Sequence, residues 1–397
     1  YKYDLLGNLA YQKSMDAGER WMFNDCMQKP VQKWDGRNNV FTFHYDDKLH
    51  RPTKVEVSEN GAAVIVISII EYGEEHASDY MRGKVYKIYD TAGIITNEEY
   101  DFKGSLLKSK RQLCTEYKQN IDWSVIGDVT LLSVTYTTEN EFDALNRPVK
   151  ITSPDRSIFT PNYNVASMLE KMIVNVKGSG DKEFVNDIGY NEKGQRIYIK
   201  YGNGVETTYE YDVETFRIKN ILTKKNGSKN LQNLSYTHDA VGNITKIIDC
   251  AQPRNFFNNM DCKPEFDYTY DAIYRLIEAH GRENDDTLIF GATDNYNDYP
   301  FKKTYSSGSP LAVRNYTEYY SYDAAGNMKA MKHSADLGNW TRIFDPETTN
   351  NRLRSTTVGS DTFDYTYNEH GSMKTMPHLF AIDWNVFEQM NHTDLDG

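Results

Sequence analysis

The sequence predicts an all-β fold assembled from repeated β-hairpins, and three observations indicate it. An aromatic residue followed by Asp or Asn and, three residues later, by Gly or a substitute recurs from one end of the chain to the other. The segments between these motifs alternate polar and apolar residues, as half-buried strands do. Aromatic residues make up 13% of the 397 residues and Pro only 11 of them, so a disordered chain is unlikely despite the low mean hydropathy.

Three copies of the motif are clearest, at residues 3–9, 322–328 and 367–373. Weaker copies are Tyr45-Asp46, Tyr89-Asp90, Tyr100-Asp101, Phe142-Asp143, Tyr190-Asn191, Tyr211-Asp212, His238-Asp239 and Tyr270-Asp271. From Asp4 the intervals are 42, 44, 11, 42, 48, 21, 27, 32, 52 and 45 residues, many near one or two multiples of roughly twenty. We therefore expect one continuous assembly over residues 1–397 rather than separate domains.

The motif has a direct physical interpretation. In Tyr-x-Tyr-Asp the two aromatic side chains lie on the same face of a strand. The Asp or Asn then accepts bonds from backbone amides of a turn, and Gly supplies a positive φ. Alternation resumes after the turn, as in residues 196–200 and 243–248. Each unit is predicted to be a hairpin with a polar corner.

A structural role for the repeated Asp, Tyr and Gly residues is favoured over catalysis, because a repeated residue is seldom a unique active-site residue. Paired carboxylates can do acid–base chemistry, but no pair is singled out. The Tyr residues could stack on sugars or nucleic-acid bases. Their place beside the turns favours packing between hairpins instead.

The elements follow in order along the chain. Residues 1–60 carry two hairpin-like units around Trp21 and Trp34, with a tight turn at 33–38. Residues 62–70 are nine apolar or small residues rich in β-branched types, which predicts a strand buried on both faces. The motifs at Asp90 and Asp101 are eleven residues apart, the length of one strand and one turn.

Two segments interrupt the repeat. Residues 118–123 are expected to form a loop or short helix, and residues 255–264 form an insertion that should project from the wall. The triplet 202–204, Gly-Asn-Gly, reads as a hairpin turn and not as a phosphate-binding loop. Residues 279–286 and 306–310 are surface connections by composition.

The net charge argues against nucleic-acid binding, and the hydropathy argues against a membrane-spanning segment. The formal net charge is −12, which disfavours a nucleic-acid backbone as the main partner, and the basic stretches at 108–111 and 224–225 read as solvated turns or strand edges. No apolar run approaches the roughly twenty residues that span a bilayer. We predict neither nucleic-acid binding nor a membrane span.

Searches for catalytic and metal motifs fail. The chain has no G-x-S-x-G, H-E-x-x-H or Walker sequence, and His44, His378 and His392 lack ligand spacing. Neither an EF-hand loop nor a calcium nonapeptide repeat surrounds the acidic residues Asp285, Asp286, Asp294 and Asp298. We therefore expect no catalytic residue, no cofactor and no metal ion.

The four Cys residues match no zinc pattern. A disulfide between Cys250 and Cys262 would close an Asn-rich loop and would fit an exported protein. Buried or free thiols are the alternative that we favour.

The motifs at 3–9, 142–148, 270–276 and 322–328 make the chain resemble RHS (YD) repeat proteins over nearly its whole length. Residues 14–21, 33–35 and 45–52 are, more narrowly, similar to the RHS region of bacterial insecticidal toxin-complex B/C subunits and their SpvB-containing relatives. The resemblance implies a spiral of hairpins that forms part of a hollow shell. That shell would sequester a C-terminal toxic effector and have neighbouring repeats or toxin-complex subunits as partners.

The family cleaves itself at a D-P-x-G signature. Asp345-Pro346-Glu347-Thr348 lacks its Gly, so no catalytic role is carried over. The abrupt start at Tyr1 and the motif-like end at 394–397 suggest a piece of a longer, secreted or cell-surface polypeptide. Two other functions stay open: surface adhesion or carbohydrate recognition, and more remotely a glycosidase that uses two carboxylates.

Overall fold

The computed structural model describes residues 1–397 apart from 47, 77–79, 228, 258, 285–311, 337–338, 377–378 and 395–397. The described residues form strands β1–β33 and the single-turn 3₁₀ helix η2 (Ile126–Asp128). None of them forms a helix with the length and hydropathy needed to span a bilayer. The all-β prediction is confirmed.

The internal contacts of the chain divide it into two compact units. The first unit contains Tyr1–Asn162, Ile173–Lys182 and Thr366–Gly397, and the second contains Tyr163–Met172 and Glu183–Tyr365. That residues 1–397 act as one continuous assembly remains a proposal.

The first unit begins with thirteen strands and ends with four short ones from the C-terminal segment. The strands are β1 (Lys2–Tyr3), β2 (Leu9–Ser14), β3 (Gly18–Asn24), β4 (Pro30–Asp35), β5 (Val40–Tyr45), β6 (Pro52–Ser58), β7 (Ile65–Tyr72), β8 (Val85–Asp90), β9 (Gly93–Tyr100), β10 (Leu106–Cys114), β11 (Leu131–Phe142), β12 (Pro148–Thr152), β13 (Ile158–Tyr163), β30 (Thr366–Tyr367), β31 (Met373–Thr375), β32 (Ala381–Trp384) and β33 (Met390–Asp394).

The second unit holds most of the remaining strands, while β14 (Leu169–Asn175), the last residue of β13 and the first two residues of β15 cross the division between the units. They are β15 (Asp181–Tyr190), β16 (Arg196–Tyr201), β17 (Val205–Tyr211), β18 (Ile218–Lys225), β19 (Lys229–His238), β20 (Ile244–Asp249), β21 (Asn255–Phe257), β22 (Met260–Cys262), β23 (Glu265–Tyr270), β24 (Leu276–Asn284), β25 (Val313–Tyr322), β26 (Met328–Ser334), β27 (Trp340–Pro346), β28 (Leu353–Val358) and β29 (Asp361–Asp364).

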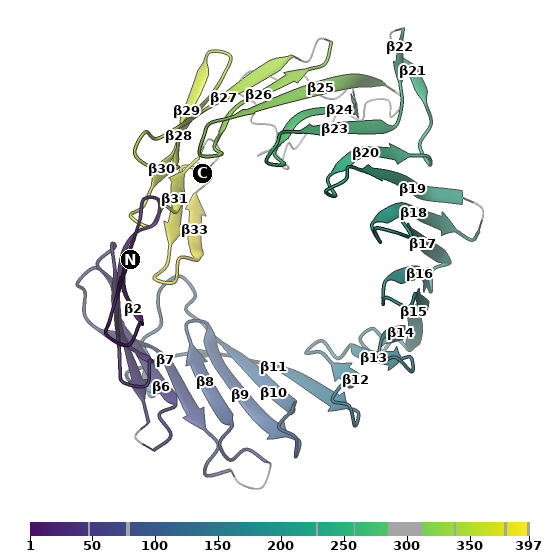
Figure 1. Cartoon of the computed structure of the whole chain (residues 1–397). Coiled ribbons are helices and arrows are strands. Elements are labelled where there is room, and N and C mark those ends of the chain that lie inside the picture. The colour runs from purple at the N-terminus through teal and green to yellow at the C-terminus, as the bar shows by residue number, and fades with distance from the viewer. Residues whose placement is uncertain are drawn as a thin grey trace. The chain divides into compact units, whose positions relative to one another are not determined.

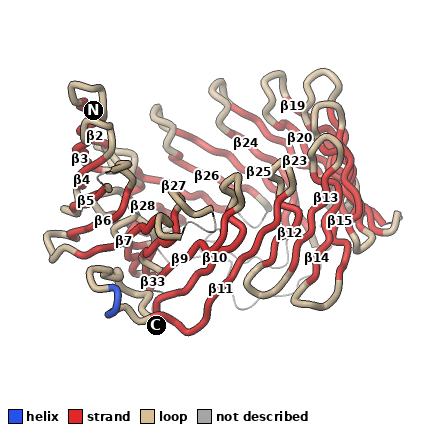
Figure 2. The backbone as a smooth tube through the Cα atoms, turned by 90° about the horizontal axis from the view of Figure 1, so that it is seen from below, coloured by secondary structure: helices blue, strands red, loops and turns tan. Residues whose placement is uncertain are grey.

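Within each unit, neighbours along the chain pair antiparallel, which makes a row of hairpins. In the first unit β7, β8, β9 and β10 pair in this order, and Figure 1 shows them side by side. In the second unit β16, β17, β18 and β19 do the same. Turns and loops lie at both ends of the strands (Figure 2). The predicted turn at 202–204 is confirmed, with Gly204 N–H donating to the Tyr201 carbonyl.

Successive turns in a row of hairpins alternate between the two ends of the strands. The turns after β1, β3, β5, β9 and β11, which contain Asp4, Asp25, Asp46, Asp101 and Asp143, therefore share one end. We call this end the YD edge and the other end the opposite edge. The opposite edge carries the turns at 14–18, 35–39 and 90–93 and the long connection at 115–130.

The two hydrophobic clusters of the first unit lie on opposite faces of β7. Val66 packs with Tyr89, Cys114, Ile121 and Trp123, while the next residue, Ile67, packs with Val57 and Val386. Adjacent strand residues face opposite sides, so β7 is buried on both faces, as predicted. The strand is shorter than expected, because residues 62–64 are exposed and precede it.

Three other expectations can be compared with the strands. Residues 1–60 hold five strands after β1, so they form more hairpins than the two predicted. Residues 118–123 form a loop without helix, and residues 255–264 form the inserted hairpin β21–β22. The expected surface connection at 279–286 is wrong for residues 279–284, which belong to β24, with Ala279 buried. Asp285, Asp286, Asp294, Asp298, His378 and residues 306–310 and 395–397 lie outside the described residues.

Candidate functional site

Each Asp of the motif holds its own turn together. The Asp4 carboxylate accepts bonds from the Leu6 N–H at 2.8 Å, the Asn8 N–H at 2.9 Å and the Asn8 side-chain amide at 2.8 Å. Side-chain bonds to the backbone of the same turn recur at Asp25, Asp35, Asp101, Asp143, Asn164, Asn191, Asp239, Asp271, Asn368 and Asn385. These carboxylates and amides therefore hold the backbone of their own turns.

At Asp4, Asp143 and Asp271, hydrogen bonds to the ionised form lower the pKa of the carboxyl. The backbone N–H of Arg147 is the largest cause at Asp143, and its guanidinium adds to the effect. At Asp46 the side chain of Arg51 lowers the pKa to about 2. The turn carboxylates are therefore charged acceptors at neutral pH.

The third residue after the Asp takes a positive φ, as Gly7 (86°), Gly104 (92°) and Gly326 (97°) do. The repeat is degenerate because residues other than Gly also occupy this position, among them Asn146 (63°) and Tyr274 (67°).

The Tyr of the motif ties its strand to the preceding one. The Tyr100 hydroxyl donates to the carbonyl of Val85, the residue that begins β8, at 2.7 Å. Tyr45, Tyr72, Tyr190, Tyr211, Tyr270 and Tyr322 make the equivalent bond to Pro30, Pro52, Leu169, Arg196, Ile244 and Leu276. The ladder register shifts at several of these strand ends, and the hydroxyl satisfies a carbonyl there.

Neighbouring turns on the YD edge are also linked to each other. Lys103 Nζ donates to the carbonyls of Asp143 (3.1 Å) and Ala144 (2.9 Å). Arg217 donates in the same way to Asp239 and Ala240. A cation from one turn therefore binds the backbone of the next.

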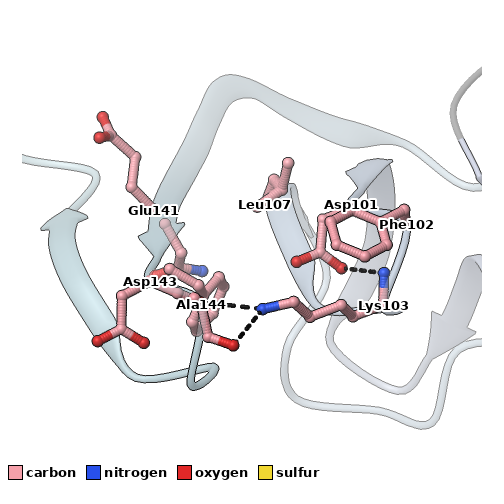
Figure 3. Close-up of a pocket in the computed structure, with 9 residues that line it drawn as sticks. Asp101, Phe102, Lys103, Leu107, Glu141, Asp143 and Ala144 are labelled. Atoms are coloured by element: carbon pink, nitrogen blue, oxygen red, sulfur yellow. Dashed lines mark hydrogen bonds between the residues drawn. The ribbon is translucent and has the colours of Figure 1, made fainter.

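The link at Lys103 crosses an open pocket of about 670 Å³ between the turns at Asp101 and Asp143 (Figure 3). Asp101 bonds to the Lys103 N–H, and the Glu141 side chain points away and pairs with Lys150. Phe102 supplies exposed apolar surface. The side chains of Asp101, Lys103 and Glu141 are thus each bonded to groups of the same sheet.

The C-terminal segment of the first unit packs against its N-terminal strands. Arg37 donates to the carbonyls of Asn385 (3.0 Å) and Trp384 (3.1 Å), and Arg20 pairs with Glu388. The His370 ring is 1% exposed. Its nitrogens lie 3.6 Å from an Asp35 oxygen and 2.6 Å from a Glu388 oxygen. We call the contact between residues 366–394 and β2–β7 the seam.

Apolar contacts complete the seam. Val386 is 4% exposed among Val57 and Ile67, and Phe387 lies 6.2 Å from Phe41, ring centre to ring centre. Beside them is a pocket of about 250 Å³, lined by residues of β2–β5 and by 386–388. The seam joins parts of the chain that are more than 300 residues apart in sequence.

A buried charged cluster in the second unit tests the glycosidase alternative. His333 lies between Glu283 (3.3 Å) and Glu318 (3.1 Å), and Arg314 pairs with Glu283. Burial raises the pKa of both Glu residues, but hydrogen bonds from His333 and, at Glu283, Arg314 outweigh it, so both pKa values end below the ordinary one. Both carboxylates are bonded to His333 in this cluster.

The structure bears on metal binding and on disulfide formation within the described residues only. Among them no three His, Cys, Asp or Glu side chains are placed to hold a metal ion. No disulfide joins Cys250 to Cys262: Cys250 is exposed, and the buried Cys262 thiol donates to the Val313 carbonyl. Asp345 and Pro346 end β27, where Asp345 pairs with Arg354.

Several residues that hold turns or join distant segments were not predicted from the sequence. The turns at Asp25, Asn164 and Asn385 were not predicted, although Asp25 stands midway between Asp4 and Asp46 and Asn164 follows Asp143 by 21 residues. A search at half the observed 42-residue interval would have found the first two. No pattern in the sequence indicated the contacts of Arg37 and His370, because their partners are distant in the chain.

Known proteins are similar to this chain in both sequence and fold. No family model matches the chain. The toxin subunits YenC2 and YenC1 of Yersinia entomophaga are 28% and 26% identical to it, over 97% and 96% of its length. A crystal structure of TcdB2-TccC3 and a structure of a Photorhabdus luminescens Tc holotoxin pore each cover 98% of the chain, at TM-score 0.84 and 26% identity.

The matched stretch is a fraction of each relative. The chain spans 42% of YenC2, 40% of YenC1 and 19% of the TcdB2-TccC3 chain. The predicted resemblance to toxin-complex subunits is confirmed in both sequence and fold. Over nearly all of its length, the chain is a homologue of the toxin subunits YenC1 and YenC2 with the fold of the matching stretch of TcdB2-TccC3.

Proposed function

We propose that this chain is a noncatalytic stretch of wall in a toxin-complex shell, which encloses a toxic effector segment until delivery. The observation that carries the proposal is the match to toxin subunits over 97% of the chain in sequence and 98% in fold. A wall fits the residue chemistry, because the repeated Asp and Tyr side chains are used to hold turns and strands.

The arrangement of strands supports this role physically. Side chains alternate between the two faces of each strand, so a single sheet can present different chemistry on each side. The Tyr hydroxyl bonds tie each strand to the preceding one, and cations such as Lys103 and Arg217 bind the backbone of the next turn. These bonds fasten each hairpin to its neighbour, which suits a barrier that must not open locally. The partners would be other toxin-complex subunits and the enclosed effector, and the polypeptide would be secreted.

The test is a protease-protection assay on the polypeptide that carries this chain, assembled with a toxin-complex B-type subunit. An unfolded reporter peptide replaces the effector, and its cleavage by a nonspecific protease is followed with time. We expect the reporter to be cleaved only after the wall is denatured. Cleavage at the rate of the free reporter, with an intact wall, would contradict the proposal.

Surface recognition is the alternative proposal, and binding to a panel of glycans distinguishes it. A sugar-binding platform of several rings would place exposed aromatic side chains together. The strongly exposed rings of Phe102, Tyr117 and Phe256 form none of the described ring pairs. No observation therefore favours this alternative over the wall.

A further inference from the structure

The ring of His370 is enclosed in the seam by parts of the chain that are distant in sequence. Its side chain is 1% exposed. The turn that carries it packs on two turns of the N-terminal strands: an added Cβ at Gly18 would lie 2.7 Å from the Glu369 carbonyl oxygen, and one at Gly36 would lie 3.8 Å from the Glu369 Cβ. A ring enclosed in this way reaches solvent only when the two segments separate.

Each nitrogen of this ring faces a carboxylate. Nε2 lies 3.6 Å from an oxygen of Asp35, at the end of β4, and Nδ1 lies 2.6 Å from an oxygen of Glu388, in the C-terminal segment. Both nitrogens are closed to solvent, and among the described residues neither has a hydrogen bond of good geometry. A neutral imidazole has a lone pair on one nitrogen, which would face a carboxylate here. The charged imidazolium is instead attracted to both carboxylates.

The charges around the ring leave a deficit of one positive charge. Arg20 pairs with Glu388 at 2.5 Å, and Arg37 lies 3.8 Å from Glu59. The Asp35 carboxylate accepts the backbone N–H of Arg37. Two carboxylates beside the ring therefore stand against the one charge of Arg20, because the charge of Arg37 is offset by Glu59. A proton on the imidazole supplies the missing positive charge.

The other charged side chains of the surrounding turns and strands add no net charge. Glu19, in β3, pairs with Lys13 at 2.7 Å. The exposed Glu369 and the amine of Lys33, which lies 5.4 Å from the centre of the Phe43 ring, have opposite signs. The balance at the ring thus depends on the imidazole itself.

We propose that His370 makes the closure of the seam depend on pH: the seam is held while the imidazole is charged and loosens when the imidazole loses its proton. Imidazole is the side chain that ordinarily changes its charge between about pH 5 and 8. The charged ring contacts two carboxylates only in the closed seam, so closure and protonation favour each other. Closure is therefore favoured at acidic pH and weakened as the pH rises through neutrality.

The loosening is local, because other contacts of the seam carry no group that titrates near neutral pH. Arg37 binds the carbonyls of Trp384 and Asn385, and Val386 packs among apolar side chains. The inference does not depend on what the wall encloses, so a failure of the protease-protection test would leave it standing.

Amide hydrogen exchange of the natural chain, measured by mass spectrometry from about pH 5.5 to 8.5, tests the proposal. Rates are divided by those of unstructured peptides at the same pH, which removes the intrinsic pH dependence of exchange. We expect the protection of residues 368–372 and 385–389 to fall by about tenfold or more over this range, the effect of losing a buried contact to a charged group. Protection in β16–β19 should change little.

Three variants make the test specific. His370→Gln should show at every pH the protection that the natural chain has at high pH, and Glu388→Gln should weaken the response because one carboxylate loses its charge. His392→Gln is the matched control, since this histidine belongs to the same segment, is 63% exposed, and should leave the response intact.

Preserved protection in β16–β19 shows that each variant is folded. A natural chain whose seam has constant protection over this range would overturn the proposal. So would a natural response in His370→Gln or in Glu388→Gln, or the loss of the response in His392→Gln.

Discussion

Tyr and Asp occur together in the repeat because each satisfies a different part of the backbone. The Asp carboxylate accepts the N–H groups of the turn that follows, as at Asp4. The Tyr hydroxyl donates to a carbonyl of the strand that precedes, as at Tyr100. An ionised carboxylate cannot replace the Tyr hydroxyl, because it has no hydrogen to donate to the carbonyl. The Tyr hydroxyl cannot replace the carboxylate, because it reaches the preceding strand and not the N–H groups of the turn.

Removing one hydroxyl should therefore cost a measurable part of the stability. We expect Tyr100→Phe to lower the free energy of unfolding by about 1 kcal/mol, because the Val85 carbonyl keeps only its bond from Asn97 and the Asn97 amide loses the Tyr100 hydroxyl as an acceptor. Denaturant titration measures the change. Tyr3→Phe is the control, since Tyr3 is 62% exposed, and a similar loss there would contradict this explanation.

The glycine of the turn is needed for its backbone conformation and not for space. Gly326 has φ of 97° with no atom within 4 Å of an added Cβ. Gly326→Ala should cost about 1–2 kcal/mol from strain alone. Gly127→Ala is the control, because that site is equally open and has no positive φ, so its stability should change little. Equal effects in the two variants would refute the strain argument.

His333 makes the stability of the second unit depend on pH. Burial lowers the pKa of His333, but its bonds to Glu283 and Glu318 outweigh this and raise the pKa from 6.5 to about 9. The stabilisation is thus complete below pH 6.5 and is lost as the pH rises to about 9. Denaturant titrations should show that His333→Gln lowers the free energy of unfolding most near pH 6.5 and least near pH 9.

The control for this pH dependence is His44→Gln, which removes a more exposed His–Glu contact. Its effect should be small throughout the window. A constant difference between His333→Gln and the natural chain from pH 6 to 10 would show that the charge of His333 is not involved.

Among the elements, the connection at 115–130 acts as a cover for one face of the sheet. Trp123 is 1% exposed, packs edge-on against Tyr89 and donates from its indole to the Asp90 carbonyl. Trp123→Ala should cost roughly 3–5 kcal/mol, measured by denaturant titration. Tyr117→Ala, in the same connection but 78% exposed, should cost little. A small loss for Trp123→Ala would mean that the cover is dispensable.

The strands and turns were predictable where the signal is local. Polar/apolar alternation after a turn with Asp or Asn sufficed for β16 and β20, and the Gly-Asn-Gly triplet sufficed for the turn at 202–204. The turns at Asn164 and Asn385 were missed because both signals are weakened: Asn replaces Asp, and Ser167 or Glu388 replaces Gly at the positive-φ position. The cover by Trp123 and the seam were beyond prediction, since both depend on contacts between distant segments and leave no periodic pattern.

At the scale of the molecule, the seam should open without unfolding the rest. Arg37→Ala removes both bonds to the carbonyls of Trp384 and Asn385. We expect faster amide hydrogen exchange in residues 381–394 and little change in β16–β19, measured by mass spectrometry. Arg254→Ala, in the inserted hairpin, is the control. Uniformly faster exchange would show that the seam is not a separate cooperative element.

The alternation of turns between two edges also restricts how such a protein can change length. Adding or removing two strands returns every later turn to its own edge. Losing one strand would move all later Asp turns to the other edge and exchange the two kinds of loop. Natural length variants of this fold should therefore differ by even numbers of strands, because only an even difference keeps each kind of turn on its own edge.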